Sequence, residues 1–444
     1  MRNERLLAIA AVAVAVVLAL FLTFRTETSH PVPPLSGPDK PGPYKVAPPV
    51  VLTAAQDHAR LLKVLGLSAL RAPAPAINSG DIGILPDPLK LNDGRVVGTP
   101  EIWWQQRRQE IADTMEIEVY GQMRGPGLLW KDSPPVPEAG PGIAATTRRV
   151  SARVATTAGA PTSTEVPLTL TVPDGAAGHV PVVLVLAAPD DVTPSLRSAI
   201  LGKGWAIAVL DVTRLQPNTA DDLPHGAIGA GSEGKPRDPK HWGVLRVWAW
   251  GASRAMDYLE GASVVDSAHV AIAGHGTYGK AAMIAMAYDP RFAVAFISSS
   301  GIGGASLLRR EPGTGVETLA GLGSYQMFAG NFLKYAGKRT AKDLPVDTHD
   351  LFALAAPRPI FISASAADPA DDPQGAFLAA TAANPVYKLL GKTGIAATTM
   401  PAVNTQSDTG EIAFHMRDGA SAGDSDWPAF VAFAERYLHG KSTP

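Results

Sequence analysis

The sequence predicts an α/β protein built on a doubly wound, mostly parallel β-sheet with helices on both faces. Continuous apolar runs of strand length occur at residues 181–188 and 205–210, and such runs are typical of parallel strands covered on both sides. Helical patterns separate the apolar runs, and the longest of them covers residues 243–260. Strands that alternate with helices in this order favour a parallel sheet.

The remaining elements fit the same sheet. Residues 149–156 and 165–172 alternate between apolar and polar side chains, which predicts a half-buried hairpin ahead of the parallel strands. The apolar pattern predicts further strands and flanking helices, at 293–297, 359–363 and 411–416 for the strands and at 195–202 and 426–438 for the helices. We therefore expect one large α/β domain over residues 141–440.

Composition narrows the possible functions. The 444 residues include 46% hydrophobic and 18% charged side chains, enough to bury a substantial core. Lys and Arg number 39 against 41 acidic residues, so the charge balance does not indicate a nucleic-acid partner. The sequence has no cysteine, which excludes disulfides, thiol nucleophiles and Cys-ligated zinc. Because His225, His241 and His349 lack metal-ligand spacing, neither a metal nor another cofactor is expected.

The N-terminal segment predicts export. Residues 6–24 are apolar apart from one threonine, and arginines precede and follow them. This pattern indicates a signal anchor over residues 1–25, with a cleaved signal peptide as the alternative. Residues 26–50 are rich in proline and read as a linker. We therefore expect the domain on the periplasmic or cell-surface side, tethered to the membrane.

Residues 51–140 are predicted to form a helical and extended block that packs on the main domain. A helix with aromatic and charged side chains is expected at 101–121. Arg107 and Arg108 could clamp a substrate, but acidic residues lie nearby in the same helix. Ordinary ion pairing on the surface is the favoured interpretation for both arginines.

Residues 270–287 have the layout of the nucleophile elbow of α/β-hydrolases. A short strand at 270–273 enters a glycine-rich turn, which opens into a helix at 278–287. In such an elbow a strained turn presents the attacking serine at the carboxyl edge of the sheet. Here Gly276 occupies the serine position. Because glycine adopts strained backbone readily, we expect the turn to survive although the nucleophile is lost.

Several segments in order along the chain resemble one family. They include WGVLRVWAWGASRAMDYLE, VAIAGHGTYGKAA, SGIGGASL, LPVDTHDLFALAAPRPIF, DDPQGAFLAATAANPVYKLLG and FHMRDG…DWPAFVAFAERYL, with LPDPL and RRQEI…EVYG upstream. Together they resemble the bacterial glucuronoyl esterases, carbohydrate esterase family 15, and their relatives assigned as acetyl-xylan esterases. The resemblance covers about residues 85–438. His349, in the fourth segment, matches a structural position of the family.

The resemblance implies cleavage of carboxylic esters between glucuronic acid and an alcohol. In this chemistry a serine attacks the ester carbonyl, a histidine moves the proton, and a carboxylate orients the histidine. The family elbow is similar to G-H-S-R-x-G-K. Gly276 replaces its serine, and Thr277 replaces its arginine, which is associated with oxyanion stabilisation. His275 and Lys280 are kept. The family's lysine holds sugar hydroxyls, so both residues are predicted to bind substrate, although Lys280 is also explained as a lysine in the first turn of a helix.

The base position is also changed. Relatives carry a stretch like H-I-R-x-G-x-H, in which the second histidine is catalytic. The corresponding run begins at His415 and ends at Ser421, so serine stands where the family has its base. His415 lies inside an apolar strand, where a packed histidine is favoured over a displaced base.

Three carboxylates compete for the acid position. Asp368 follows a strand and matches the usual family position, with Asp371 and Asp372 close by. In other branches the carboxylate lies just before the SGxGG motif. This chain has Ser298 and Ser299 there, which excludes a catalytic carboxylate at that position.

These changes predict a pseudoesterase that binds a carbohydrate or uronic-acid ligand through Lys280. A second hypothesis is a slow or unconventional hydrolase of glucuronate or acetyl esters of xylan. It would use Thr277, or a water placed by Asp368, although β-branched threonine resists the strained backbone. A third hypothesis is a scaffold for partner proteins.

Overall fold

The computed structural model describes residues 50–73, 82–123, 127–138, 142–155, 165–176, 178–232, 235–310, 315–419 and 426–438. The expected anchor at 6–24 and nearly all of the proline-rich linker lie outside these ranges. Within them, no helix combines the length and apolar character that crossing a membrane requires. Export and membrane attachment stay predictions.

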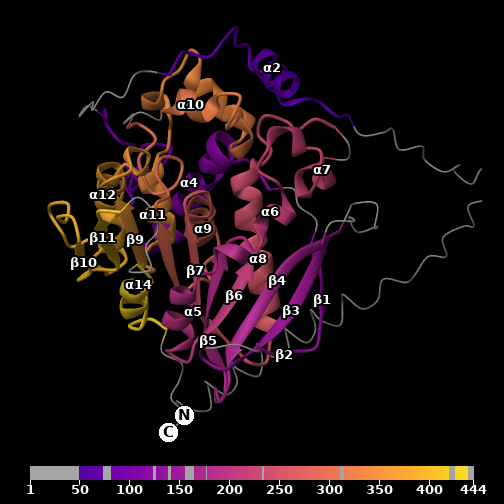
Figure 1. Ribbon diagram of the computed structural model, residues 1–444. Coiled ribbons are helices and arrows are strands. Elements are labelled where there is room, and N and C mark those ends of the chain that lie inside the picture. The colour runs from indigo at the N-terminus through magenta and orange to yellow at the C-terminus, as the bar shows by residue number, and fades with distance from the viewer. Residues whose placement is uncertain are drawn as a thin grey trace, which may run out of the picture. The chain divides into compact units, whose positions relative to one another are not determined.

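Within the described residues, eleven strands form one sheet (Figure 1). Its strand order is β1-β3-β4-β6-β5-β7-β8-β9-β11-β10, and β2 pairs with β3. The strands are β1 Leu128–Asp132, β2 Val136–Pro137, β3 Ala145–Val154, β4 Glu165–Pro173, β5 Val180–Leu186, β6 Ala206–Leu210, β7 Val265–His275, β8 Val294–Ser298, β9 Ile360–Ser365, β10 Thr405–Ser407 and β11 Ile412–Arg417.

The sheet is mixed, which corrects the expectation of a mostly parallel one. Strands β6, β5, β7, β8, β9 and β11 run parallel in the middle. Antiparallel strands lie at both edges, β1 to β4 on one side and β10 on the other. Antiparallel neighbours can be joined by short turns, whereas parallel strands need a long crossover. Because β1 is mostly exposed and β10 is only three residues long, neither edge strand has the apolar pattern of the centre.

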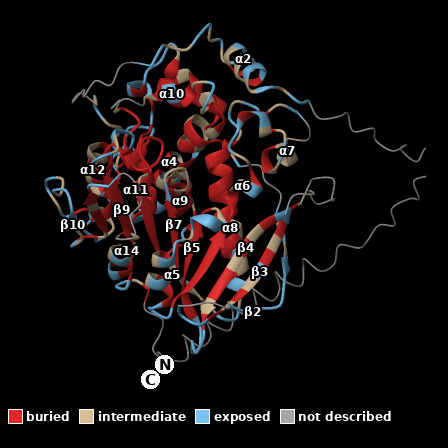
Figure 2. Ribbon diagram, viewed as in Figure 1, coloured by how far each residue is buried: buried red, intermediate tan, exposed pale blue. Residues whose placement is uncertain are grey.

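Helices cover both faces of the parallel strands (Figure 2). Helices α8, α9 and α11 pack on one face, and α5 and α14 pack on the other. The helices are α2 Ala54–Val64, α3 Pro100–Ile102, α4 Arg108–Met115, α5 Pro194–Leu201, α6 Val212–Leu215, α7 Ala227–Gly231, α8 Val244–Gly261, α9 Thr277–Tyr288, α10 Val316–Ala320, α11 Thr348–Ala355, α12 Pro373–Ala382, α13 Asn384–Leu389 and α14 Asp426–Ala434. Strand β5 is buried along its whole length, which confirms the prediction from its continuous apolar run.

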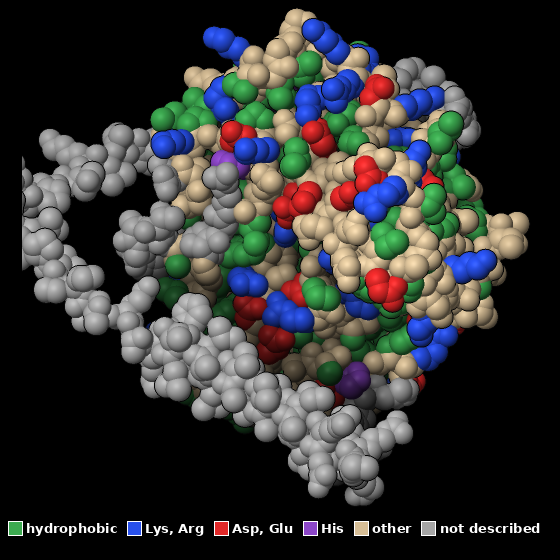
Figure 3. Space-filling view, turned by 180° about the vertical axis from the view of Figure 1, so that it is seen from behind, with side chains coloured by type: hydrophobic (Ala, Val, Ile, Leu, Met, Phe, Trp, Pro, Cys, Tyr) green, Lys and Arg blue, Asp and Glu red, His purple; other side chains and the backbone are tan. Residues whose placement is uncertain are grey.

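The N-terminal block shares a core with the sheet. Leu61 and Trp103 are fully buried in the same apolar cluster as the strand residues Val182 and Leu184. The predicted helix at 101–121 is observed as α3, α4 and two π-helical segments, Trp103–Arg107 and Glu116–Tyr120. Basic and acidic side chains are interspersed on the face of the molecule shown in Figure 3.

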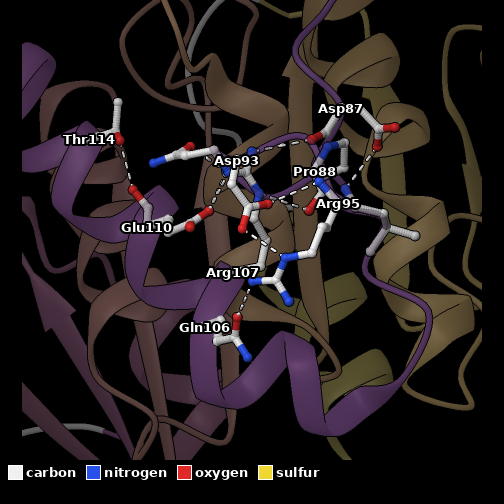
Figure 4. Close-up of polar contacts among 10 residues, drawn as sticks. Asp87, Pro88, Asp93, Arg95, Gln106, Arg107, Glu110 and Thr114 are labelled. Carbon is white, nitrogen blue, oxygen red and sulfur yellow. Dashed lines mark hydrogen bonds and ion pairs between the residues drawn. The ribbon is translucent and has the colours of Figure 1, made fainter.

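Neither Arg107 nor Arg108 forms only the expected surface ion pair, and Figure 4 shows the contacts of Arg107. Arg107 does pair with Glu110 at 3.1 Å, but it is buried and also donates to the carbonyl oxygens of Asp87 and Pro88. Arg108 donates to the carbonyl of Ala287 at the end of α9. Both arginines therefore hold segments of the fold together.

Candidate active site

The elbow predicted from the sequence is present between β7 and α9. Gly276 has φ 57° and ψ −123° and directly precedes the first residue of the helix. A Cβ atom on Gly274 would lie 2.5 Å from the carbonyl carbon of Tyr278, and one on Gly279 would lie 2.9 Å from the carbonyl oxygen of Ser298. Glycine is required at both positions because the strand, turn and helix pass so close to one another.

The space at Gly276 is open. A Cβ atom there would meet no heavy atom within 4 Å. Its backbone N–H donates to the carbonyl of Ser298 at 2.9 Å, and its carbonyl accepts from the N–H of Lys280 at 3.1 Å. The turn is thus held by its own hydrogen bonds and leaves room for a side chain that this residue lacks.

Two cavities flank the elbow. One, of about 610 Å³, is lined by residues from 185 to 196 together with His275, Gly276 and Trp427. The other, of about 460 Å³, is lined by Lys280 and by residues from 319 to 328. Asn218 and Thr277 line both cavities, so the two spaces adjoin at the start of α9. We call them the His275 cavity and the Lys280 cavity.

Lys280 lies one turn along α9 and lines the second cavity. Its ammonium group donates to the carbonyl oxygens of Ser300 and Ile302. Because an ammonium group has three N–H donors, one remains for a ligand. Burial lowers the pKa of Lys280 to about 8, and the nearby Asp371 opposes the shift. The residue is therefore charged at pH 7 but close to its titration range.

Gln326 is a polar residue of the Lys280 cavity that the sequence did not reveal. It is buried and lines the Lys280 cavity. Its amide nitrogen donates to the carbonyl oxygens of Asn218 and Gly323, which sets the orientation of the amide. The amide oxygen, Oε1, has no hydrogen-bond partner among the described residues. A buried acceptor without a partner is costly.

His275 lines the other cavity and does not face Lys280. Its Nδ1 lies 3.2 Å from the hydroxyl oxygen of Ser298 on the neighbouring strand β8. Burial of part of the ring and the positive charge of Arg417 lower the pKa of His275, while Asp426 and Asp191 oppose the shift. His275 is therefore neutral at pH 7.

The two positions considered for a base differ in what the structure shows. Ser421, the expected base position, lies outside the described residues. His415 is in β11 with a side chain only 14% exposed, and its Nδ1 lies 3.2 Å from a carboxylate oxygen of Asp426 at the start of α14. His415 is thus a mostly buried residue that faces Asp426, and its interpretation as a packed histidine stays a prediction.

The three aspartates after β9 have different surroundings. Asp368 caps the short turn that follows it, because its carboxylate accepts from the N–H of Ala370 at 2.9 Å. Asp372 caps α12 and pairs with Arg310 at 3.1 Å. Asp371 is buried and accepts from the N–H of Ser365 at 2.6 Å. Of the three, only Asp371 points back toward the end of β9.

Arg417 connects Asp371 to the rest of a polar network. Its guanidinium group lies 3.8 Å from Asp371 and 3.2 Å from Asp426, and it also donates to the hydroxyl of Ser299. Burial raises the pKa of Asp371, while the Ser365 N–H, the Ser299 hydroxyl and Arg417 oppose the rise. Arg417 thus links two carboxylates, that of Asp371 in the turn after β9 and that of Asp426 at the start of α14.

Thr277 lacks the partners of a nucleophile. It is the first residue of α9, and no hydrogen bond in the described part of the chain joins its hydroxyl to a histidine. The described residues also include no cluster of three or more His, Cys, Asp or Glu side chains that could hold a metal ion.

The sheet order, the elbow after β7 and the acid region after β9 define an α/β-hydrolase fold. The fungal glucuronyl esterase model matches residues 155–391. Carbohydrate esterase MZ0003, from an unknown prokaryotic organism, is 30% identical over 399 residues, which cover 80% of this chain and 90% of the relative. The chain belongs to the glucuronoyl esterase family.

Solved structures agree with this assignment. A CE15 glucuronoyl esterase from Teredinibacter turnerae T7901 is 35% identical with a TM-score of 0.79, and the match covers 86% of this chain and 99% of that one. A glucuronoyl esterase from Solibacter usitatus is 29% identical with a TM-score of 0.71, covering 84% and 100%. A curated relative from Schizophyllum commune, 29% identical over 73% of this chain and 78% of its own length, is a 4-O-methyl-glucuronoyl methylesterase.

Proposed function

We propose that this chain is a pseudoesterase that binds a glucuronate unit, free or esterified, and does not cleave it. One observation carries the proposal. The elbow keeps its backbone but presents Gly276, while the adjoining cavity keeps a charged donor, Lys280, and a buried acceptor, the Oε1 atom of Gln326. A carbohydrate offers hydroxyls to both groups, and a uronate adds a negative charge for the ammonium. The likeness to the Schizophyllum commune relative, a 4-O-methyl-glucuronoyl methylesterase, supports this ligand class.

The loss of turnover follows from the groups that are missing. Ester hydrolysis in this fold needs an oxygen nucleophile beside a base. Gly276 has no side chain, and His275 is bound to the buried hydroxyl of Ser298 instead. Removing several members of such a triad costs about six orders of magnitude in kcat. We therefore expect binding to remain and hydrolysis to be lost.

Calorimetric titration with D-glucuronic acid and its methyl ester, combined with an assay for methanol release, tests the proposal. We expect saturable binding of both compounds without methanol. At pH 7, Lys280→Met should weaken binding of D-glucuronic acid at least about 30-fold, since it removes a charged hydrogen bond to the carboxylate, and Gln326→Met should weaken it roughly 10-fold, since it removes one neutral hydrogen bond. Lys388→Ala, which changes an exposed lysine on α13, is the matched control and should bind like the wild type.

A variant at the rim keeps the test decisive if the buried substitutions disturb folding. Leu322 lines the Lys280 cavity and is 50% exposed, so Leu322→Trp should narrow the cavity without affecting the core. Weaker binding by this folded variant supports the proposal. Methanol release that Thr277→Ala abolishes would instead establish a hydrolase, and the absence of any binding would leave the scaffold hypothesis.

A further inference from the structure

Helix α2, Ala54–Val64, lies beside α10 at the periphery of the fold (Figure 1). Of its 11 residues only Asp57 and Leu61 are buried, so Leu61 is the one apolar side chain of the helix that is fully enclosed. A helix of this length is marginal in water on its own. The position of α2 therefore depends in large part on the polar contacts of its first turn.

The first turn of α2 is bonded to two walls of the Lys280 cavity. The backbone N–H of Ala54, a residue that lines the cavity, donates to the carboxylate of Asp221 at 2.6 Å. Asp221 directly follows the wall formed by residues 218–220. On the other wall, the Tyr325 hydroxyl donates to the carbonyl oxygen of Ala54 at 3.1 Å and lies 3.2 Å from a carboxylate oxygen of Asp57.

These contacts converge on Gln326. Tyr325 precedes it in the same 3₁₀ segment and is fully buried, and the Gln326 amide donates to the carbonyl of Asn218 at 2.6 Å. Burial, reinforced by the negative charge of Asp57, raises the pKa of Tyr325, so its hydroxyl is a protonated donor at pH 7. Because both walls meet at Gln326 and both are bonded to α2, a displacement of α2 would move the Oε1 atom of Gln326.

Resting on the function proposed above, we propose that α2 is a positioning strap for the glucuronate site: docking of α2 and binding of the ligand stabilise each other. The first turn of α2 holds Tyr325, and Tyr325 in turn sets the position of Gln326. Since Tyr325 and Asp57 do not line the cavity, they act through Gln326 and are positioning residues. Coupling between two sites is reciprocal, so the bound ligand also holds α2 in place.

Tyr325→Phe removes only the hydroxyl and tests the strap by calorimetric titration with D-glucuronic acid. We expect the Kd to rise about 5-fold, at the lower end of the usual range for coupled sites. Tyr387→Phe is the matched control, because Tyr387 is equally buried, donates to the carbonyl of Arg358 at 2.9 Å and lines neither cavity. It should lower stability but leave the Kd unchanged. In a Gln326→Met background, Tyr325→Phe should change the Kd by less than about 2-fold, since the two residues act as one unit.

Amide hydrogen exchange of the wild-type protein, followed by mass spectrometry, tests the reverse direction without any variant. Saturating D-glucuronic acid should slow exchange in α2 about 5-fold, while exchange in α13 should not change. If Tyr325→Phe binds like the wild type, or if the bound ligand leaves exchange in α2 unchanged, the strap is overturned and the glucuronate site stands. If the wild-type protein binds no glucuronate, both this inference and the proposed function fail.

Discussion

The turn at Gly276 and the cavity at Lys280 are one helical turn apart, but the turn retains only its backbone shape and the cavity retains polar side chains. The turn keeps its backbone path but has no reactive side chain, whereas the cavity is lined by the polar side chains of Lys280 and Gln326. The elbow's shape is imposed by close packing at Gly274 and Gly279, so it does not depend on the nucleophile. A serine at φ 57° would carry strain of about 1–3 kcal/mol, and glycine removes that cost. The absence of a side-chain nucleophile at Gly276 is therefore compatible with an intact fold.

We expect the largest effect from restoring the missing nucleophile and base. The double variant Gly276→Ser and Ser421→His replaces the nucleophile and the base at the positions that match the family. We expect methyl glucuronate hydrolysis to rise by about three orders of magnitude or more over the wild-type protein, since triad members act as a unit. Stopped assays of methanol release measure this rate.

The single variants are the controls for this experiment. Gly276→Ser alone and Ser421→His alone should both stay near background, because neither completes a nucleophile and base pair. A folded double variant that is as inactive as the wild-type protein would show that these two positions do not face each other. In an active double variant, Asp371→Asn should abolish the gain and Asp368→Asn should not, given that only Asp371 points toward the end of β9.

Close packing around the turn predicts that alanine substitutions at Gly274 and at Gly276 differ in their effect on the free energy of unfolding. Gly274→Ala places a methyl group 2.5 Å from the Tyr278 backbone and should lower the free energy of unfolding by about 3 kcal/mol. Gly276→Ala meets open space and bears only the backbone strain, about 1 kcal/mol. Urea denaturation measures both values. Equal losses in the two variants would mean that the turn is not held by close packing.

The sequence predicted the parts of the site that depend on local backbone. Gly276 was placed correctly at the turn because the strand, glycines and helix around it form a continuous motif. The edge strands β1 and β10 were missed because one is largely exposed and the other very short. The three aspartates after β9 could not be separated, since the directions of side chains within one tight turn depend on the strands and helices around it.

Gln326 and the His275 cavity show a second limit. Gln326 belongs to a short 3₁₀ segment with no recognisable motif, and its unpartnered oxygen depends on contacts with Asn218, over 100 residues away. His275 matched a family position and was predicted to bind substrate together with Lys280. His275 ends β7 whereas Lys280 lies in α9, so the sharp turn between them decides which cavity each side chain lines. Such assignments need the folded chain.

The contribution of the Lys280 charge to ligand binding can be tested by changing the pH. The pKa of Lys280 is about 8, so its ammonium form, present at pH 7, is lost as the pH rises through that value. The carboxylate of D-glucuronic acid stays ionised throughout. The fraction of charged lysine at pH 9.5 is about 3%, and the apparent Kd for glucuronate should therefore rise roughly 30-fold between pH 7 and pH 9.5. Calorimetric titration at both pH values measures the change.

Two controls tie this effect to Lys280. D-glucuronamide has no charge to lose and should show a much smaller change, and Lys280→Arg, whose guanidinium group stays protonated, should bind glucuronate similarly at both pH values. Unfolding does not explain the loss, because a lysine with a lowered pKa makes the folded state more stable as the pH rises from about 8 toward 10.5, where the unfolded chain still holds the proton. Equal losses for the acid and the amide would place the titrating group elsewhere, since only a charge that faces the carboxylate separates the two compounds.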